Sequence, residues 1–158
     1  MFNNITDEII QLVTFKIDNE EFGIDILKVE EIIKLVLITK IPNSPEFVEG
    51  VIDLRGKLIP IIDLRVRLKR NKKNFDNNMR VIVVEVSGMI VGFIVDSVKE
   101  VIRIPNKIIE PPPSLVIDGS ADYITAIGKL EDRLLILLDL EKVLDKQQKT
   151  ELSQFNLE

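Results

Sequence analysis

The chain has 158 residues, of which 46% are hydrophobic and 30% charged, and its formal net charge at pH 7 is −5. This composition excludes a largely disordered protein, and the acidic balance argues against a dedicated nucleic-acid-binding protein. The absence of histidine and cysteine excludes Ser-His-Asp and Cys-His catalytic sites, a phosphohistidine relay, and zinc, haem or iron–sulfur sites built from these residues.

The N-terminal part of the chain predicts a hairpin followed by an ambiguous segment. Residues 12–17 alternate between apolar and polar side chains, a turn is expected at 19–21, and a second strand follows over 22–26. The segment 26–34, ILKVEEIIK, then places apolar residues at helical spacing. It is either a core strand with a short turn or an apolar binding surface, and periodicity alone does not separate the two.

The next predicted hairpin joins strands near 51–54 and 58–62 through the tight turn Arg55-Gly56-Lys57. Pro60 lies inside the second strand and cannot donate a backbone hydrogen bond. We therefore expect that strand to lie at a sheet edge or to be bulged at the proline.

Asp63 and Asp139 each follow an apolar strand and precede a short helical pattern, DLRVRL and DLEKVL. A paired role in acid–base catalysis is one reading, but an aspartate that caps a helix N-terminus explains both positions more simply. No oxygen-ligand loop of the EF-hand kind accompanies them.

In the second half, hairpins are predicted over 82–86 with 90–95, and over 126–130 with 134–138. The polar segment 70–78 reads as a linker between the halves, and the polar tail from Gln147 onward is expected to fray after a last helix.

The second half of the chain resembles the first. A shift of 69 residues aligns 11–34 with 80–103, and a shift of 76 aligns 50–68 with 126–144. Such repetition predicts an internal duplication. Short strands separated by tight turns are typical of small barrels, so we expect a mostly β fold of two packed barrels with short helices.

A basic run over 65–73 offers an alternative function. A small β-barrel could use these side chains to bind a nucleic-acid phosphate backbone. Phe75 is the one nearby aromatic residue for stacking and the rest of the chain is acidic, so a solvated linker is the favoured explanation of the run. The run comprises Arg65, Arg67, Lys69, Arg70, Lys72 and Lys73.

Several segments resemble the CheW family, the coupling proteins of bacterial chemotaxis. They are EEFGIDILKVEEII, FVEGVIDLRGKLIPIIDLRVRL, VGFIVDSVKEVIRI and LLILLDLEKVL, in family order from about Gln11 to Leu144. The resemblance implies a single CheW-like domain over 1–158 with two SH3-like five-stranded β-barrel subdomains. Their approximate limits are 11–69 and 79–146, with exchange of strands between them allowed.

The resemblance also implies a set of receptor-binding residues. Many family members have asparagine at the position of Asp53, so this sequence departs from the family pattern in the polar surroundings of Arg55. The implied receptor-binding residues are Val13, Ile26, Val29, Glu31, Ile32, Arg55 and Val98.

By the same resemblance the protein is a non-enzymatic adaptor that couples chemoreceptor cytoplasmic tips to the regulatory domain of the histidine kinase CheA. It implies no catalytic residue, cofactor, metal, nucleic acid or direct membrane insertion. The N-terminus lacks the basic and apolar segments of a signal peptide, so we expect a cytoplasmic protein that its partners recruit to membrane receptor arrays.

Overall fold

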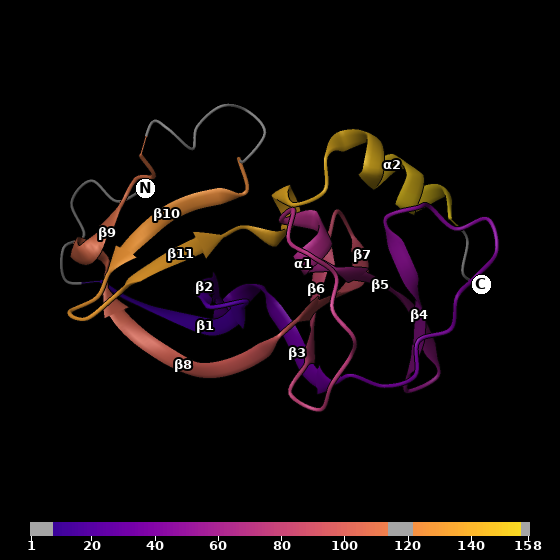
Figure 1. Cartoon of the computed structure of the whole chain (residues 1–158). Helices are drawn as coiled ribbons and strands as arrows, with labels where there is room; N and C mark the ends of the chain where they lie inside the picture. The colour runs from indigo at the N-terminus through magenta and orange to yellow at the C-terminus, as the bar shows by residue number, and fades with distance from the viewer. Residues whose placement is uncertain (1–7, 114–121, 156–158) are drawn as a thin grey trace.

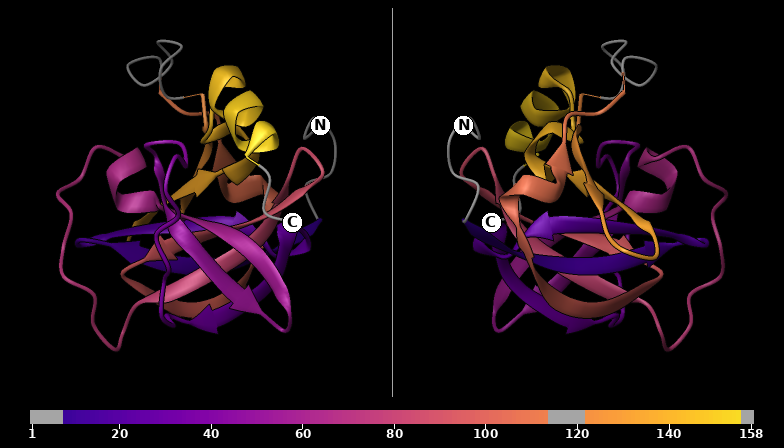
Figure 2. Two further views of the ribbon diagram at one scale, coloured as in Figure 1. Left: turned by 90° about the vertical axis from the view of Figure 1, so that its right-hand side faces the viewer. Right: turned by 90° about the vertical axis from the view of Figure 1, so that its left-hand side faces the viewer.

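A computed structural model describes residues 8–113 and 122–155, which form two β-sheets side by side (Figure 1). The first sheet has the strand order β8-β1-β2-β11-β10-β9, and the second has the order β3-β6-β7-β5-β4. Both sheets are strongly curved in the end views (Figure 2). The mostly β fold with two small sheets is confirmed, with the two-residue strand β9 added to one of them.

The element bounds are as follows. The six-stranded sheet contains β1 (Ile9–Ile17), β2 (Glu20–Asp25), β8 (Ser97–Pro105), β9 (Ile109–Glu110), β10 (Ile124–Lys129) and β11 (Leu134–Leu138). The five-stranded sheet contains β3 (Val29–Lys34), β4 (Val48–Leu54), β5 (Lys57–Asp63), β6 (Arg80–Val86) and β7 (Met89–Val95). Within the described residues the helical elements are η1 (Ile26–Lys28), α1 (Leu64–Arg67), η2 (Asn106–Ile108), η4 (Leu140–Lys142) and α2 (Lys146–Gln154).

Each sheet combines strands from both halves of the sequence. The β1–β2 hairpin inserts between β8 and β11, whereas the β6–β7 hairpin inserts between β3 and β5. The five-stranded sheet therefore uses 29–95, and the six-stranded sheet uses 9–25 with 97–138. The sheets change over at η1 and at Asp96, and not at the polar segment 70–78.

The pairing registers of the two sheets repeat each other. In the six-stranded sheet Leu137 pairs with Gly23, and in the five-stranded sheet Ile61 pairs with Gly92, both in parallel. These pairs are related by the same shifts of 76 and 69 residues that align the sequence. The internal repeat of the sequence is therefore also present in the structure, where equivalent residues pair with equivalent partners.

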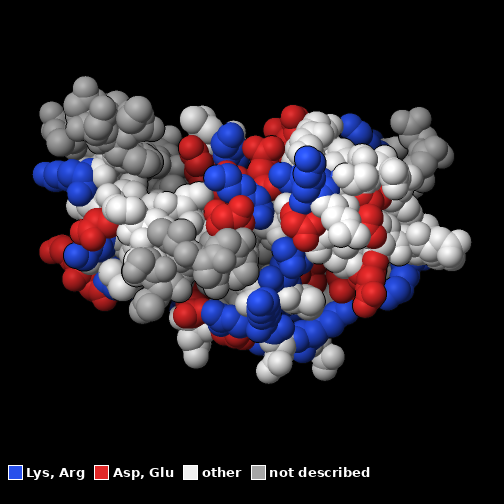
Figure 3. Space-filling model, turned by 90° about the horizontal axis from the view of Figure 1, so that it is seen from above, with Lys and Arg blue, Asp and Glu red and all other residues white. Residues whose placement is uncertain are grey.

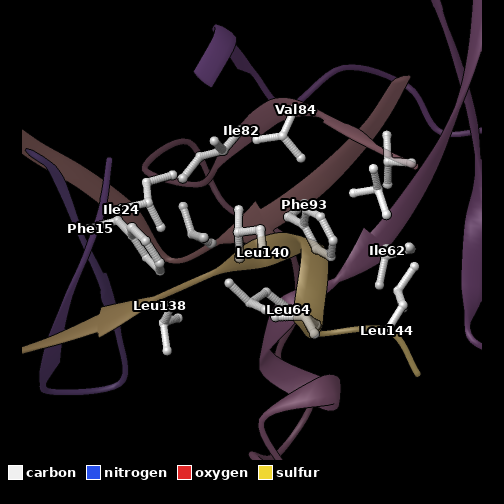
Figure 4. Packing of buried hydrophobic residues seen from close by; sticks show 14 of the residues in the cluster. Phe15, Ile24, Ile62, Leu64, Ile82, Val84, Phe93, Leu138, Leu140 and Leu144 are labelled. Atoms are coloured by element: carbon white, nitrogen blue, oxygen red, sulfur yellow. The ribbon is translucent and has the colours of Figure 1, made fainter. Parts of the chain in front are cut away.

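In the part of the chain that the structure describes, three apolar clusters stabilise this arrangement, one inside each curved sheet and one between the sheets. In the shared cluster, Phe15 and Ile24 from one sheet approach Ile82 and Phe93 from the other, with Leu140 beside them (Figure 4). Residues of the short helices also pack into this cluster. The facing surfaces of the two sheets are therefore buried in one common core.

The segment 26–34 is a single 3-10 turn followed by a strand, and not a helix. Asp25 ends β2, and its side chain accepts the Leu27 backbone N–H at 2.9 Å. In β3 the exposure of the side chains then alternates, which is the period of a strand with one face against the core. The predicted turn at 19–21 lies slightly earlier, where Asp18 adopts φ +56°.

The expectation for Pro60 is wrong in both of its forms. The strand β5 lies between β7 and β4 and is no edge strand, and the register shift of the β4–β5 pair falls between Val48 and Gly50 and not at the proline. Pro60 lies opposite Val51, whose N–H and carbonyl bond instead to Thr39 at 2.8 and 2.9 Å. The proline nitrogen therefore faces away from β4, and pairing with β7 begins only at Ile61. The sheet therefore has no backbone hydrogen bond at this nitrogen that a proline would remove.

The tail from Gln147 is helical as far as Gln154, and residues 156–158 lie outside the described part of the chain. It forms the helix α2, which lies above the five-stranded sheet (Figure 1). Asp145 and Gln148 form a reciprocal capping box at its start, with N···O distances of 2.8 and 3.0 Å. Leu152 is buried in the shared cluster and anchors the helix to the core.

Candidate interaction site

An exposed ion pair joins the edge strand β3 to the β4–β5 turn. The Nη1 and Nη2 atoms of Arg55 donate to the two carboxylate oxygens of Glu31 at 2.8 and 2.6 Å. The Arg55 side chain remains 70% exposed and that of Glu31 28% exposed. The bidentate hydrogen bonds from Arg55 lower the pKa of the Glu31 carboxyl, so the pair stays charged at neutral pH.

Asp53 supports the turn that carries Arg55. Its Oδ1 accepts the backbone N–H of Gly56 at 2.7 Å. An asparagine oxygen could accept the same hydrogen bond, so the departure from the common family residue preserves this local contact.

Apolar side chains of the predicted site lie at and below the surface. Ile26, Val29 and Val98 are half-buried and pack against the shared cluster. Ile32 is the most open of them, at 37% exposed. These side chains and the Glu31–Arg55 pair belong to η1, β3, β8 and the β4–β5 turn.

Val13 differs from its expected role. It lies on β1 in the six-stranded sheet and is 1% exposed, so its side chain offers no surface to a partner in this structure. Its place is in the shared cluster beneath the half-buried residues.

Sequence reasoning missed Val101, an exposed apolar residue on the edge strand β8. It is 51% exposed, and the 69-residue shift makes it the counterpart of Ile32 on β3. The repeat itself was the signal that could have identified it.

The two candidate catalytic aspartates are helix caps. Asp63 accepts the backbone N–H of Arg65, and Asp139 accepts that of Glu141, both at 3.0 Å. The fully buried Arg65 side chain also donates to the Asp63 carboxylate at 2.9 and 2.8 Å. The Asp63 carboxylate therefore has a structural role, and the buried Arg65 does not contribute to the predicted basic surface.

Most other cations of the basic run are also held by nearby acceptors. Arg67 donates to the carbonyl of Val143, Arg70 pairs with Asp18 and Glu20, Lys72 with Glu49, and Lys73 with Asp18 and Asp96. On the face seen from above, basic and acidic side chains are interleaved (Figure 3). The run therefore gives no support to a nucleic-acid-binding surface.

Among residues 8–113 and 122–155, no group of three or more acidic, histidine or cysteine side chains is arranged to hold a metal ion. None of the helices in this part of the chain has the length and hydropathy required to cross a membrane.

Comparison with known proteins adds the decisive observation, since the family model for the CheW-like domain matches residues 11–148. The chain belongs to the CheW family. It is 41% identical to the chemotaxis protein CheW of Klebsiella aerogenes over 138 residues, covering 87% of this chain and 83% of the relative. It is 39% identical to the CheW protein of Helicobacter pylori over 142 residues, covering 89% and 84%.

A solved structure agrees with the sequence comparison. The scaffolding protein TtCheW from Thermoanaerobacter tengcongensis superposes with a TM-score of 0.79 at 41% identity, over 87% of this chain and 94% of that one. Family, relatives and fold together assign this CheW-family chain the function of a chemotaxis scaffold.

Proposed function

We propose that this scaffold couples the cytoplasmic tips of methyl-accepting chemoreceptors to the regulatory domain of the histidine kinase CheA. The observation that carries the proposal is the exposed Glu31–Arg55 pair on a CheW-family fold, beside the apolar residues of β3 and β8. The protein works in the cytoplasm and reaches the membrane through its partners.

The chemistry of the surface suits a helical partner. Two N–H groups of Arg55 donate to the Glu31 carboxylate. The other N–H donors of its guanidinium are available to carbonyl or carboxylate oxygens of a receptor tip. Ile32 and the half-buried Ile26, Val29 and Val98 offer apolar contacts of the kind that a helix covers with residues spaced three and four apart. Val13 contributes as the buried support of this surface.

Coupling of this kind requires no chemical step. The chain has no histidine or cysteine, and Asp63 and Asp139 are occupied as helix caps. Coupling therefore rests on simultaneous binding of two partners, and the protein neither hydrolyses ATP nor accepts phosphate on histidine.

The test is calorimetric titration of the purified protein with a receptor cytoplasmic fragment, with the CheA regulatory domain, and with both together. We expect each partner to bind alone and the three proteins to form one complex. Failure of the receptor fragment to bind, or mutual exclusion of the two partners, would overturn the coupling role. A parallel titration with single-stranded RNA at two salt concentrations tests the nucleic-acid alternative, which requires a steep salt dependence.

A further inference from the structure

The β4–β5 hairpin closes through a two-residue turn with both residues in the left-handed region. Arg55 has φ +54° and Gly56 has φ +86°, between the last strand pair Leu54 and Lys57. Glycine adopts this conformation freely, whereas arginine adopts it at an energetic cost. Arg55 is thus held in an unfavourable backbone conformation at the position from which it reaches Glu31.

Asp53 fixes the peptide unit between these two turn residues. Its exposed side chain accepts the Gly56 N–H at 2.7 Å, while Arg55 donates to Glu31 on another strand. Orientation of this peptide sets the direction in which the Arg55 side chain leaves the turn. The carboxylate of Asp53 therefore acts on the ion pair through the backbone.

The β6–β7 hairpin provides an internal comparison. Its turn residues Ser87 and Gly88 have φ values of +51° and +82°, and the residue matching Asp53 is Glu85. Among the hydrogen bonds described for this structure, none runs from the Gly88 N–H to a side chain. The same turn type forms in this chain without such a bond, so closing the hairpin does not by itself require Asp53.

We propose that Asp53 is a positioning residue that holds Arg55 in the orientation for pairing with Glu31 and for partner binding. The inference rests on the proposed function for its effect on binding, but its effect on the ion pair is independent of any partner. The required property is a hydrogen-bond acceptor, which aspartate and asparagine share.

The test compares Asp53→Ala with Asp53→Asn and with the matched control Glu85→Ala. Nuclear magnetic resonance follows the pKa of the Glu31 carboxyl in each full-length variant. We expect Asp53→Ala to raise this pKa toward the ordinary glutamate value, because the Arg55 hydrogen bonds that lower it are weakened. Asp53→Asn and Glu85→Ala should leave it unchanged.

Binding of the receptor cytoplasmic fragment is the second measurement. Asp53→Ala should weaken it roughly three- to tenfold, the equivalent of one lost hydrogen bond, and Asp53→Asn should restore it. Asp53→Val, which lacks an acceptor but favours a strand, replaces the alanine variant if that variant unfolds.

The outcomes separate the two proposals. If Arg55→Ala leaves receptor binding intact, the proposed receptor surface is wrong, and the Glu31 pKa still decides the positioning role. If Arg55→Ala weakens binding whereas Asp53→Ala changes neither binding nor the Glu31 pKa, the positioning role is overturned. An equal change in the Glu85→Ala variant would also overturn it.

Discussion

Gly23 and Gly92 occupy equivalent places in the two sheets, each paired with a parallel strand from the other half of the sequence. The space around them differs. A Cβ atom on Gly92 would lie 2.6 Å from Val81 Cγ1 and 2.7 Å from Ile61 Cδ1, whereas one on Gly23 would lie 3.2 Å from two leucine methyl groups. The five-stranded sheet is therefore the more tightly packed at this position.

We expect Gly92→Ala to destabilise the protein by about 1–3 kcal/mol, because Val81 is buried and β-branched and cannot easily move away. Gly23→Ala, its matched control, should cost less because the leucine ends can shift by a few tenths of an ångström. Urea unfolding of both variants measures the difference. Equal losses would contradict the unequal packing.

Arg55→Glu should abolish receptor-fragment binding and uncouple kinase activation with little effect on folding. The substitution places two carboxylates together at an exposed position, and surface changes usually alter stability by less than about 0.5 kcal/mol. Binding assays and thermal melts are compared with Glu31→Arg/Arg55→Glu, which restores opposite charges. A large loss of melting temperature in Arg55→Glu would mean that the pair is structural.

Val98→Asp should weaken receptor binding at least about tenfold, because binding would bury an unpaired carboxylate. Val98 is half-buried, so we expect the variant to fold with a lowered melting temperature. Val13→Asp is the contrasting variant and should not fold, since Val13 is 1% exposed. Circular-dichroism melts of both variants, together with their affinities for the receptor fragment and for the kinase domain, test this expectation. A folded Val98→Asp variant with unchanged receptor affinity would refute the surface assignment.

Stability should fall in acid partly through Asp18. Hydrogen bonds from Lys73 and then Arg70 lower the pKa of the Asp18 carboxyl in the folded protein. Its contribution to stability is therefore present above the ordinary aspartate pKa and is lost as pH falls through the lower folded value. Melting temperatures of the wild type and Asp18→Asn should differ at neutral pH and converge as the pH falls below the ordinary aspartate pKa and through the lower folded value. A constant difference across this range would contradict the assignment.

Asp145→Ala should loosen α2 without unfolding the sheets. The substitution removes the carboxylate that caps Gln148, a loss of about 1 kcal/mol for a typical N-cap. Hydrogen exchange of the amides over 146–154 should accelerate, while the amides of β6 and β7 keep their protection. Asp145→Asn, which retains a capping oxygen, should behave as the wild type, and uniform acceleration in both regions would argue against local fraying.

Features determined by neighbours in the chain were predictable from the sequence. The caps at Asp63 and Asp139 depend on an amide two residues away, and the turn at Ser87-Gly88 joins strands that pair immediately. The repeat and the family motifs were also visible, because they are patterns of residues and not of contacts. The family, the mostly β class and most hairpins followed from these.

Features determined by residues far apart in the chain emerged only in the tertiary structure. Pro60 is tolerated because Val51 bonds to Thr39, and Val13 is buried because the β1–β2 hairpin inserts among strands from the second half. The exchange of hairpins and the burial of Arg65 likewise depend on which strand lies beside which. Local propensity decides that a strand forms, but its neighbour is selected by the joint burial of apolar surface from distant segments, which no short window of sequence contains.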